Sequence, residues 1–186
     1  MLIYEGKSVY DSPICIEFLE DFFPEKTPHL LPQDPFMKAK ARLLGDHITK
    51  KIIPNFYAIL GKETEEERKS AKEALTESVA QLMRDASEEG PFMLGAQPTL
   101  PDIMLAPWGY RSEVVLSHFR DFVFPSSDAS PEFKRYHEWM KAVNEWDCFK
   151  KTLADEQKLI GTYERYANNT AKSLVADAIR KGTALP

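Results

Sequence analysis

Apolar residues recur at helical spacing along most of the chain, and only the first ten residues follow a different pattern. Two short apolar runs, Leu2-Ile3-Tyr4 and Val9-Tyr10, flank the polar segment Glu5-Gly6-Lys7-Ser8. Gly6 can supply the positive φ angle that a tight turn requires. We therefore predict a short β-hairpin at the N-terminus, and we predict that every later element is a helix.

The first predicted helix begins at Ser12. The Ser12 hydroxyl can accept a backbone N–H of the first turn, and Pro13 suits the first helical position because its missing N–H costs nothing there. Pro24 is expected to help end this helix. Five residues at helical spacing are expected to form its buried face: Ile14, Cys15, Phe18, Leu19 and Phe22.

Two long helices are predicted next. Asp34 and Pro35 are the start signals of the first, whose apolar positions continue to Leu60, and Pro54 should kink it near residues 50–53. Thr64 and Glu67 form a capping-box pattern that opens the second, which Gly90-Pro91 should terminate. We expect the two helices to form an antiparallel pair.

The second half of the chain is also predicted to be helical. Residues 103–108 are apolar nearly all round, which is typical of a helix in the middle of a bundle, and Pro107 and Gly109 should weaken it. Ser130-Pro131 should start another helix. A last helix is expected from about Ala154 to Ile179, with weak helix formers at residues 166–170 that could break it.

Composition and charge narrow the classes of function. The 186 residues carry a net charge of −5, and Lys and Arg are not clustered, which argues against a nucleic-acid partner. The two cysteines form no CxxC pattern, and the four histidines form no ligand pattern, so neither a disulfide framework nor a metal site is expected. The sequence has no apolar run long enough for a membrane span. We expect a cytoplasmic protein without membrane association.

Two stretches of the sequence carry a family resemblance. The first is Tyr4-Glu5-Gly6-Lys7 through Asp11-Ser12-Pro13-Ile14 to Phe18-Leu19-Glu20-Asp21-Phe22-Phe23-Pro24, and the second contains Gly95, Thr99 and Asp102. Together they resemble the glutathione transferase superfamily, closest to its omega-like class. The resemblance implies a mainly α fold: a remnant β-hairpin plus helix of a thioredoxin-like domain, followed by an all-α C-terminal domain.

The resemblance also implies the organisation of the chain. Residues 1–24 are expected to form a partial thioredoxin-like domain, residues 25–34 a linker, and residues 35–186 the helical domain. The family's first strand–helix–strand–helix unit, with its catalytic residue, is not among these 186 residues. We therefore expect an N-terminally truncated chain with weak or no activity, unless a longer natural protein supplies the unit.

Asp11 and Ser12 match the acidic residue and serine that hold the γ-glutamyl end of glutathione in the family. A helix start with free N–H groups favours a carboxylate, and Asp11 could accept the ammonium group. From residues 11–13 alone, an ordinary helix cap is the simpler interpretation. Asp11 is one methylene shorter than the family's usual glutamate, which shortens its reach toward the ammonium group.

The remaining candidate residues have weaker or structural roles. Trp108 and Arg111 are candidates for lining the co-substrate pocket, although aromatic packing and a surface arginine would explain them equally well. Thr99 and Asp102 are expected to cap a buried helix reciprocally, not to act in catalysis. Cys15 lies in the first turn of the predicted helix, where a cysteine can act as a nucleophile, but its apolar neighbours favour a thiol that faces the core. We assign no catalytic residue.

Two functions of different classes follow. The first is an omega-like glutathione transferase that conjugates glutathione or transfers thiols, with glutathione as substrate, no cofactor, a small electrophilic or disulfide co-substrate, and a homodimeric assembly. The second is a non-enzymatic helical interaction module of the same family, in which the exposed edge of the hairpin could pair with another chain.

Overall fold

The N-terminal hairpin predicted from the sequence is present. In this computed structural model, which describes residues 1–185, β1 (Leu2–Tyr4) pairs antiparallel with β2 (Lys7–Val9). Glu5 and Gly6 have φ angles of 47° and 77°, as a two-residue type I′ turn requires. The second strand begins at Lys7 rather than Val9 because Glu5 shares the turn with Gly6. The register places these residues opposite one another: Leu2 and Val9, Ile3 and Ser8, Tyr4 and Lys7.

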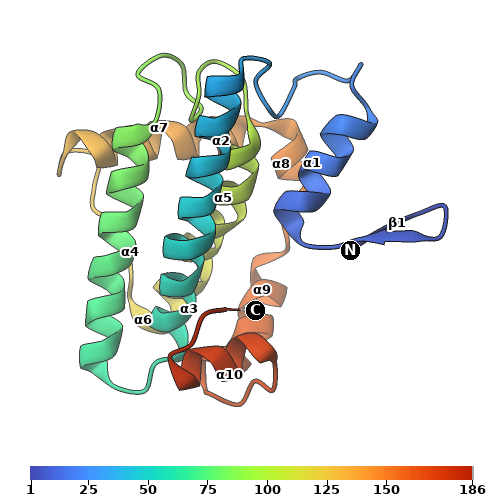
Figure 1. Cartoon of the computed structure of the whole chain (residues 1–186). Helices are drawn as coiled ribbons and strands as arrows, with labels where there is room; N and C mark the ends of the chain where they lie inside the picture. Colours follow the sequence, from blue (N-terminus) through green and yellow to red (C-terminus); the bar gives the residue numbers. More distant parts are fainter. Residues whose placement is uncertain (186) are drawn as a thin grey trace.

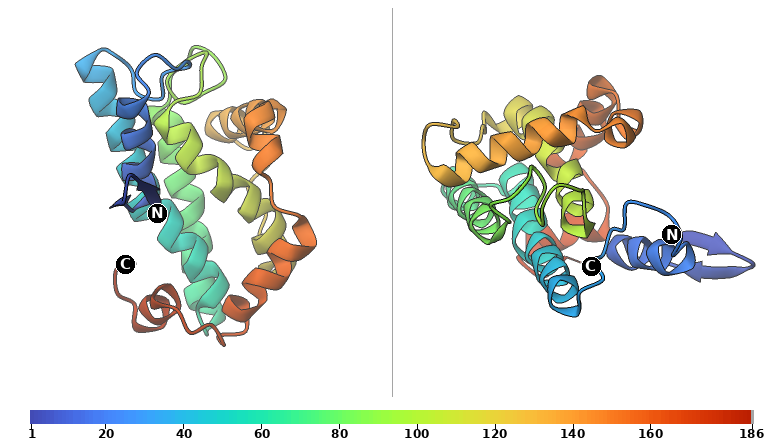
Figure 2. Two further views of the ribbon diagram at one scale, coloured as in Figure 1. Left: turned by 90° about the vertical axis from the view of Figure 1, so that its right-hand side faces the viewer. Right: turned by 90° about the horizontal axis from the view of Figure 1, so that it is seen from above.

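The first helix, α1 (Ser12–Phe22), lies at the edge of the bundle, and the hairpin projects from it into solvent (Figures 1 and 2). Asp11, not Ser12, occupies the cap position, since its carbonyl accepts the first helical bond from Cys15 N at 2.9 Å. The prediction that one face of this helix is buried is wrong. No residue of α1 is buried, and Ile14 and Leu19 are 55% and 41% exposed. The reason is its position, because one side of α1 packs against α5 and β2 while the other faces solvent.

The first long helix is interrupted where Pro54 predicted a kink. It consists of α2 (Pro35–His47), the π-helical turn η1 (Ile48–Ile52) and α3 (Ile53–Gly61). Ile53 N donates to Ile48 O, which widens the helix directly before the proline that lacks a donor.

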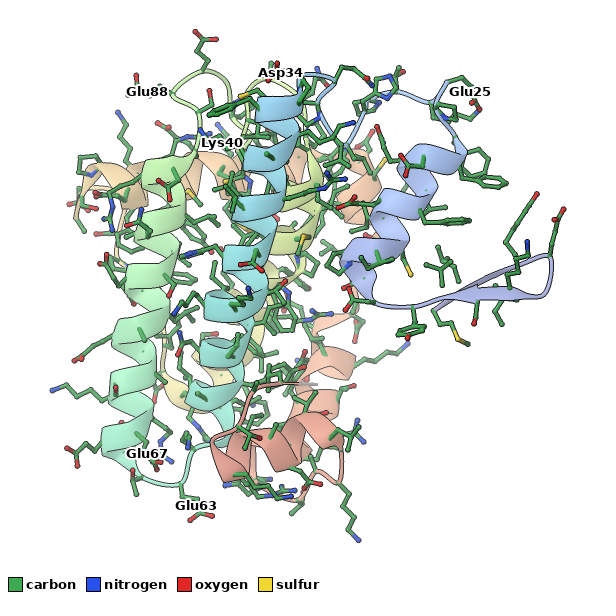
Figure 3. The ribbon with its side chains drawn as sticks, in the orientation of Figure 1. Glu25, Asp34, Lys40, Glu63, Glu67 and Glu88 are labelled. Carbon is green, nitrogen blue, oxygen red and sulfur yellow. The ribbon has the colours of Figure 1, made fainter. Side chains whose placement is uncertain are left out.

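The second long helix, α4 (Glu65–Asp85), packs against α3 as the predicted pair. Its capping box is confirmed: Glu67 N donates to Thr64 Oγ1 at 3.2 Å, and Thr64 N donates to Glu67 Oε2 at 3.3 Å. Glu63 and Glu67 lie at the outer end of the bundle in Figure 3, and both residues are exposed.

The central helix is longer than predicted. It runs through α5 (Leu100–Arg111), the π-helical turn η2 (Ser112–Leu116) and α6 (Ser117–Arg120) without stopping at Pro107 or Gly109. A Cβ atom built on Gly109 would lie 3.4 Å from Trp139 and 3.0 Å from Met140. Close packing of α7 against α5 therefore outweighs the weak local propensity.

The C-terminal part contains more breaks than predicted. Helix α7 (Pro131–Glu145) is capped by Ser130, whose hydroxyl accepts Phe133 N at 3.4 Å. The single last helix expected from about Ala154 to Ile179 is instead two, α9 (Glu156–Ala167) and α10 (Leu174–Lys181), and a further short helix, α8 (Asp147–Thr152), precedes them. The break after Ala167 falls in the weak segment, where Asn169 adopts a φ angle of 56°.

The main core lies between α3, α4, α5, η2 and α7, and it contains fully buried residues such as Phe56, Leu75 and Trp139. A smaller cluster joins Leu31, Ala41 and Leu100, and Leu100 N donates to Leu30 O at 2.8 Å. Residues 30 and 31 are therefore anchored to the start of α5. Among residues 1–185, no helix is both long and apolar enough to cross a membrane.

Candidate functional site

The start of α1 is an open turn of strained backbone. Asp11 has φ 72° and ψ 129°, a conformation that non-glycine residues rarely adopt. Such strain persists only where surrounding contacts enforce it, and it concentrates at binding and catalytic sites. One contact at this turn is the hydrogen bond that Cys15 Sγ donates to Val9 O at 3.4 Å, which links β2 to the first turn of the helix.

The polar groups at this turn face solvent. The N–H groups of Ser12 and Ile14 precede the first helical bond, and Pro13 between them has none. Within residues 1–185, neither the Asp11 carboxylate nor the Ser12 hydroxyl hydrogen-bonds to another protein group, and both residues are exposed. The turn therefore presents two backbone donors, one hydroxyl and one carboxylate to a ligand.

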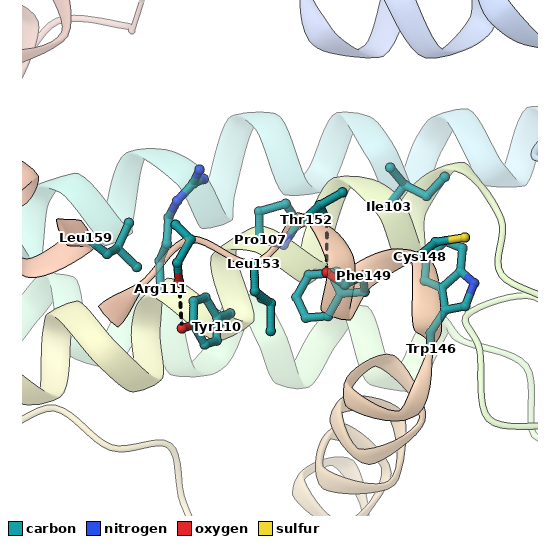
Figure 4. Close-up of a pocket in the computed structure, with 12 residues that line it drawn as sticks. Ile103, Pro107, Tyr110, Arg111, Trp146, Cys148, Phe149, Thr152, Leu153 and Leu159 are labelled. Carbon is teal, nitrogen blue, oxygen red and sulfur yellow. Dashed lines mark hydrogen bonds between the residues drawn. The ribbon is translucent and has the colours of Figure 1, made fainter. Parts of the chain in front are cut away.

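A second candidate site is an apolar cavity of about 430 Å³ between α5 and α8 (Figure 4). Tyr110 and Phe149 meet edge to face across it, with ring centroids 6.4 Å apart. The Tyr110 hydroxyl donates to Ala154 O at 3.2 Å, which holds the segment before α9 against α5. Cavities of this size and character commonly hold small molecules. The lining residues are Ile103, Ala106, Pro107, Tyr110, Arg111, Trp146, Cys148, Phe149, Thr152, Leu153, Ala154 and Leu159.

Only one of the two residues proposed for a co-substrate pocket lines this cavity. Arg111 does, and its Cζ atom lies 4.7 Å from the centre of the Trp108 ring. Trp108 packs on the neighbouring surface of α5. The centroid of its ring lies 5.2 Å from that of Phe56 and 5.7 Å from that of Tyr57. Burial raises the pKa of Tyr57 far above its ordinary value, and nearby tyrosines add to that shift. Arg111 therefore connects the cavity to an aromatic cluster.

Asp102 is buried, and protein groups satisfy its carboxylate. It is completely buried, and its carboxylate accepts four hydrogen bonds at 2.8–2.9 Å, from Met93 N, Thr99 N, Thr99 Oγ1 and Trp139 Nε1. Burial raises the pKa of Asp102, and the four hydrogen bonds oppose that rise. Since every carboxylate position is occupied by a donor from the protein, Asp102 has no free acceptor for a substrate.

Sequence reasoning missed most of the cavity. Tyr110, Phe149 and Leu153 come from segments that meet only in the folded chain. The available signal was Phe149, an aromatic residue shortly after Trp146, in a stretch for which no helix was predicted. Cys148 is exposed at the cavity, and Cys15 is half-buried with its sulfur against Val9 O. No group of three or more potential metal ligands occurs within the described part of the chain, residues 1–185.

Comparison with known proteins identifies the family. Residues 62–142 match the sequence model described as "Glutathione S-transferase, C-terminal domain". The crystal structure of glutathione transferase Omega 3C from Trametes versicolor superposes with a TM-score of 0.77 at 34% identity, covering 91% of this chain and 70% of that one. The chain therefore belongs to the glutathione S-transferase superfamily.

Two further known proteins are similar to the chain. The Tau class glutathione S-transferase from mango, Mangifera indica, has a TM-score of 0.77 at 22% identity, covering 89% of this chain and 74% of that one. The probable glutathione S-transferase parC of Nicotiana tabacum is 28% identical over 163 residues, which span 86% of this chain and 69% of that protein. The shared fold thus extends over more than one class of the superfamily.

Proposed function

We propose that this chain is an omega-like glutathione transferase whose turn at Asp11 and Ser12 binds the γ-glutamyl end of glutathione. The observation that carries the proposal is the open, strained turn at the start of α1, with polar groups that no other part of residues 1–185 engages. The omega assignment is supported by the 34% identity to the Trametes omega structure.

Each group at the turn has a role in this proposal. The Ser12 hydroxyl and the N–H groups of Ser12 and Ile14 donate to the α-carboxylate of the γ-glutamyl group, which the helix dipole also favours. The Asp11 carboxylate accepts from the ammonium group. These contacts hold one end of a flexible tripeptide and contribute roughly 2–3 kcal/mol before ordering costs. We therefore expect millimolar affinity and weak or no conjugation from the 186-residue chain by itself.

The apolar cavity beside α5 is the proposed co-substrate pocket. Its lining suits a small electrophile or disulfide with an apolar body, and Arg111 at the cavity can orient a polar or anionic group. Glutathione itself provides the thiol as substrate, so the proposal needs no cofactor and names no catalytic residue of this chain. The reaction is attack of the glutathione thiolate on an electrophile, or thiol exchange with a disulfide.

Isothermal titration with glutathione tests the turn. Ser12→Ala and Asp11→Ala should each weaken millimolar binding by about tenfold, since each removes one charged or charge-assisted contact. Asp21→Ala, near the other end of α1, is the matched control and should bind like the wild type. Equal affinity in all variants would exclude the turn as the site, and micromolar affinity of the wild-type chain would contradict the expected weakness.

The alternative function is a non-enzymatic interaction module, and a specific surface favours it. The two-stranded hairpin has two open edges, and Ile3, Tyr10 and Ile14 are 68%, 74% and 55% exposed. An open strand edge beside apolar side chains can pair with another chain, including a second copy in a homodimer. Size-exclusion chromatography with light scattering should then give a dimer that Ile3→Lys dissociates. A wild-type monomer at high concentration would count against both the dimer and the module.

A further inference from the structure

The hairpin and α1 pack against each other as one unit. The ring centroid of Phe22, at the end of α1, lies 4.6 Å from that of Tyr4 in β1. At the start of the same helix, Cys15 Sγ donates to Val9 O in β2. Both ends of α1 are therefore connected to the hairpin, and we refer to residues 1–23 as the N-terminal arm.

The arm meets the helical bundle through a small and partly charged surface. Ile16, Glu17 and Glu20 are the residues of α1 that contact later parts of the chain, and no residue of α1 is buried. Ile16 packs against the smaller core cluster that contains Leu100. Seen from above in Figure 2, the arm lies to one side of the bundle. Segments with few buried apolar contacts and a polar interface open at low free energy.

The strongest polar contact between the arm and the bundle is an ion pair. Arg42 Nε donates to Glu17 Oε1 at 3.1 Å, and Arg42 Nη2 donates to Glu17 Oε2 at 2.6 Å, which joins α1 to α2. The side chains of Glu17 and Arg42 are 25% and 53% exposed. The paired geometry makes this contact directional, while its exposure allows dissolved salt to screen it. The pair can therefore hold the arm and can also release it.

The chain on the far side of the arm is fixed to the bundle. Leu100 N donates to Leu30 O at 2.8 Å, so the bundle anchors the chain at residue 30. Glu20 reaches the same point, since its Oε2 accepts Leu30 N at 3.0 Å and its Oε1 lies 3.1 Å from His29 Nδ1. Residues 24–29 belong to neither a helix nor a strand. They form the natural hinge between the arm and the anchored residue.

We propose that the N-terminal arm opens from the bundle as one unit about residues 24–29, and that the Glu17–Arg42 pair is the latch that keeps it closed. In the closed state α1 packs against α5, the helix that also lines the apolar cavity. Opening carries the turn at Asp11 and Ser12 away from α5. The latch thereby sets the position of the glutathione site relative to the cavity, a consequence that rests on the proposed function; the opening itself does not.

Hydrogen–deuterium exchange of the full chain at pH 7 tests the opening. An opened arm leaves α1 as an isolated helix of 11 residues, which is marginal in water. Its amides should exchange about a hundredfold faster than the slowest amides of α4 and α5. Raising NaCl from about 0.05 M to about 0.5 M should accelerate α1 about threefold, with no change in α4 and α5. Amides of α1 that exchange as slowly as those of α5 would overturn the proposal.

Variants test the latch. Arg42→Met should accelerate exchange in α1 about threefold to fivefold at low salt and should abolish the response to salt. Lys50→Met is the matched control, because it removes an equal charge and breaks the exposed pair that Lys50 Nζ forms with Asp46 at 2.8 Å. It should leave exchange in α1 unchanged. Glu17→Arg combined with Arg42→Glu should restore part of the protection that each single variant loses. Equal exchange in Arg42→Met and Lys50→Met would exclude the latch.

The exchange experiments contain no glutathione, so their result is independent of the proposed binding site. Faster exchange of α1 in Arg42→Met, together with no glutathione binding by the wild type, would refute the binding site and support the arm. Glutathione binding at the turn, together with slow exchange of α1 that Arg42→Met does not change, would support the binding site and refute the arm.

Discussion

The indole N–H of Trp139 donates to Asp102 Oδ1 at 2.9 Å, joining the middle of α7 to the first turn of α5. The same oxygen accepts Met93 N, and Oδ2 accepts both the N–H and the hydroxyl of Thr99. Four donors thus converge on one buried carboxylate. Because a buried donor without an acceptor is costly, this network should be among the most sensitive points of the fold.

Asp102→Asn should strongly destabilise the protein. Each carboxylate oxygen of Asp102 now accepts two hydrogen bonds, and asparagine replaces one of these oxygens with an NH₂ group. That group can only donate, so at least one buried N–H would lose its acceptor. We expect a loss of about 3 kcal/mol in the free energy of unfolding, measured by urea denaturation. Asp85→Asn at the exposed end of α4 is the control and should change stability by less than about 0.5 kcal/mol. A near-neutral Asp102→Asn would show that the network contributes little.

The capping box of α4 should make its stability depend on pH. The Thr64 hydroxyl, followed by the Thr64 N–H and Lys62, lowers the pKa of Glu67 below its ordinary value of 4.5. A lowered folded-state pKa stabilises the protein above pH 4.5, and that contribution is lost as pH falls through the folded-state pKa. Thr64→Ala should therefore lower the melting temperature by about 2–4 °C at pH 7.

The difference between the Thr64→Ala variant and the wild type should shrink as pH falls below 4.5, since protonated Glu67 no longer gains from Thr64. Thermal melts at pH 7, 5 and 3.5 measure this. Thr76→Ala, in the middle of the same helix, should show no such pH dependence. A constant difference across all three values would indicate that Glu67 does not titrate with the cap.

Two helical glycines should respond oppositely to alanine. A Cβ on Gly109 would meet Met140 Sδ at 3.0 Å and Trp139 at 3.4 Å, whereas a Cβ on Gly161 in α9 would meet nothing within 4 Å. Gly109→Ala should cost about 1–3 kcal/mol through overpacking. Gly161→Ala should gain about 0.5–1 kcal/mol through helix propensity. Chemical denaturation of both variants checks the pair, and a stabilising Gly109→Ala would mean that α5 and α7 can separate without cost.

Arg120 should be a further point of sensitivity, because it joins two helix ends. Its guanidinium donates to Leu60 O and Ala167 O at 2.6 Å each and to Ile59 O at 3.3 Å, near the C-termini of α3 and α9. Arg120→Met should cost about 2–4 kcal/mol, since it leaves carbonyl groups of both helices without a donor. Arg120→Lys should recover only part of that loss, because one ammonium cannot span all three acceptors. Equal stability of the Lys variant and the wild type would contradict this geometry.

Local signals predicted much of the secondary structure. Gly6 indicated the hairpin turn, Thr64 with Glu67 indicated the start of α4, Ser130-Pro131 indicated α7, and Pro54 indicated the interruption that appears as η1. Each is an effect of a few neighbouring residues on backbone geometry or on unpaired N–H groups. Such effects operate within one turn of chain and need no knowledge of the fold.

The errors have the opposite character. The apolar positions of α1 indicated a buried face, but the fold places this helix at the edge, where that face stays partly exposed. Pro107 and Gly109 indicated a weak helix, but packing of Trp139 and Met140 stabilises α5 across both. Propensity and periodicity do not specify which partner, if any, covers a face.

The sequence by itself determined the hairpin turn and several helix starts, because these depend on residues close together in the chain, and its family resemblance indicated the class of fold and Asp11 with Ser12 as candidate binding residues. Only the tertiary structure decided which side chains surround a cavity. Tyr110 meets Phe149 across the cavity beside α5. Cavities form between elements distant in sequence, and their shape follows from how whole helices pack.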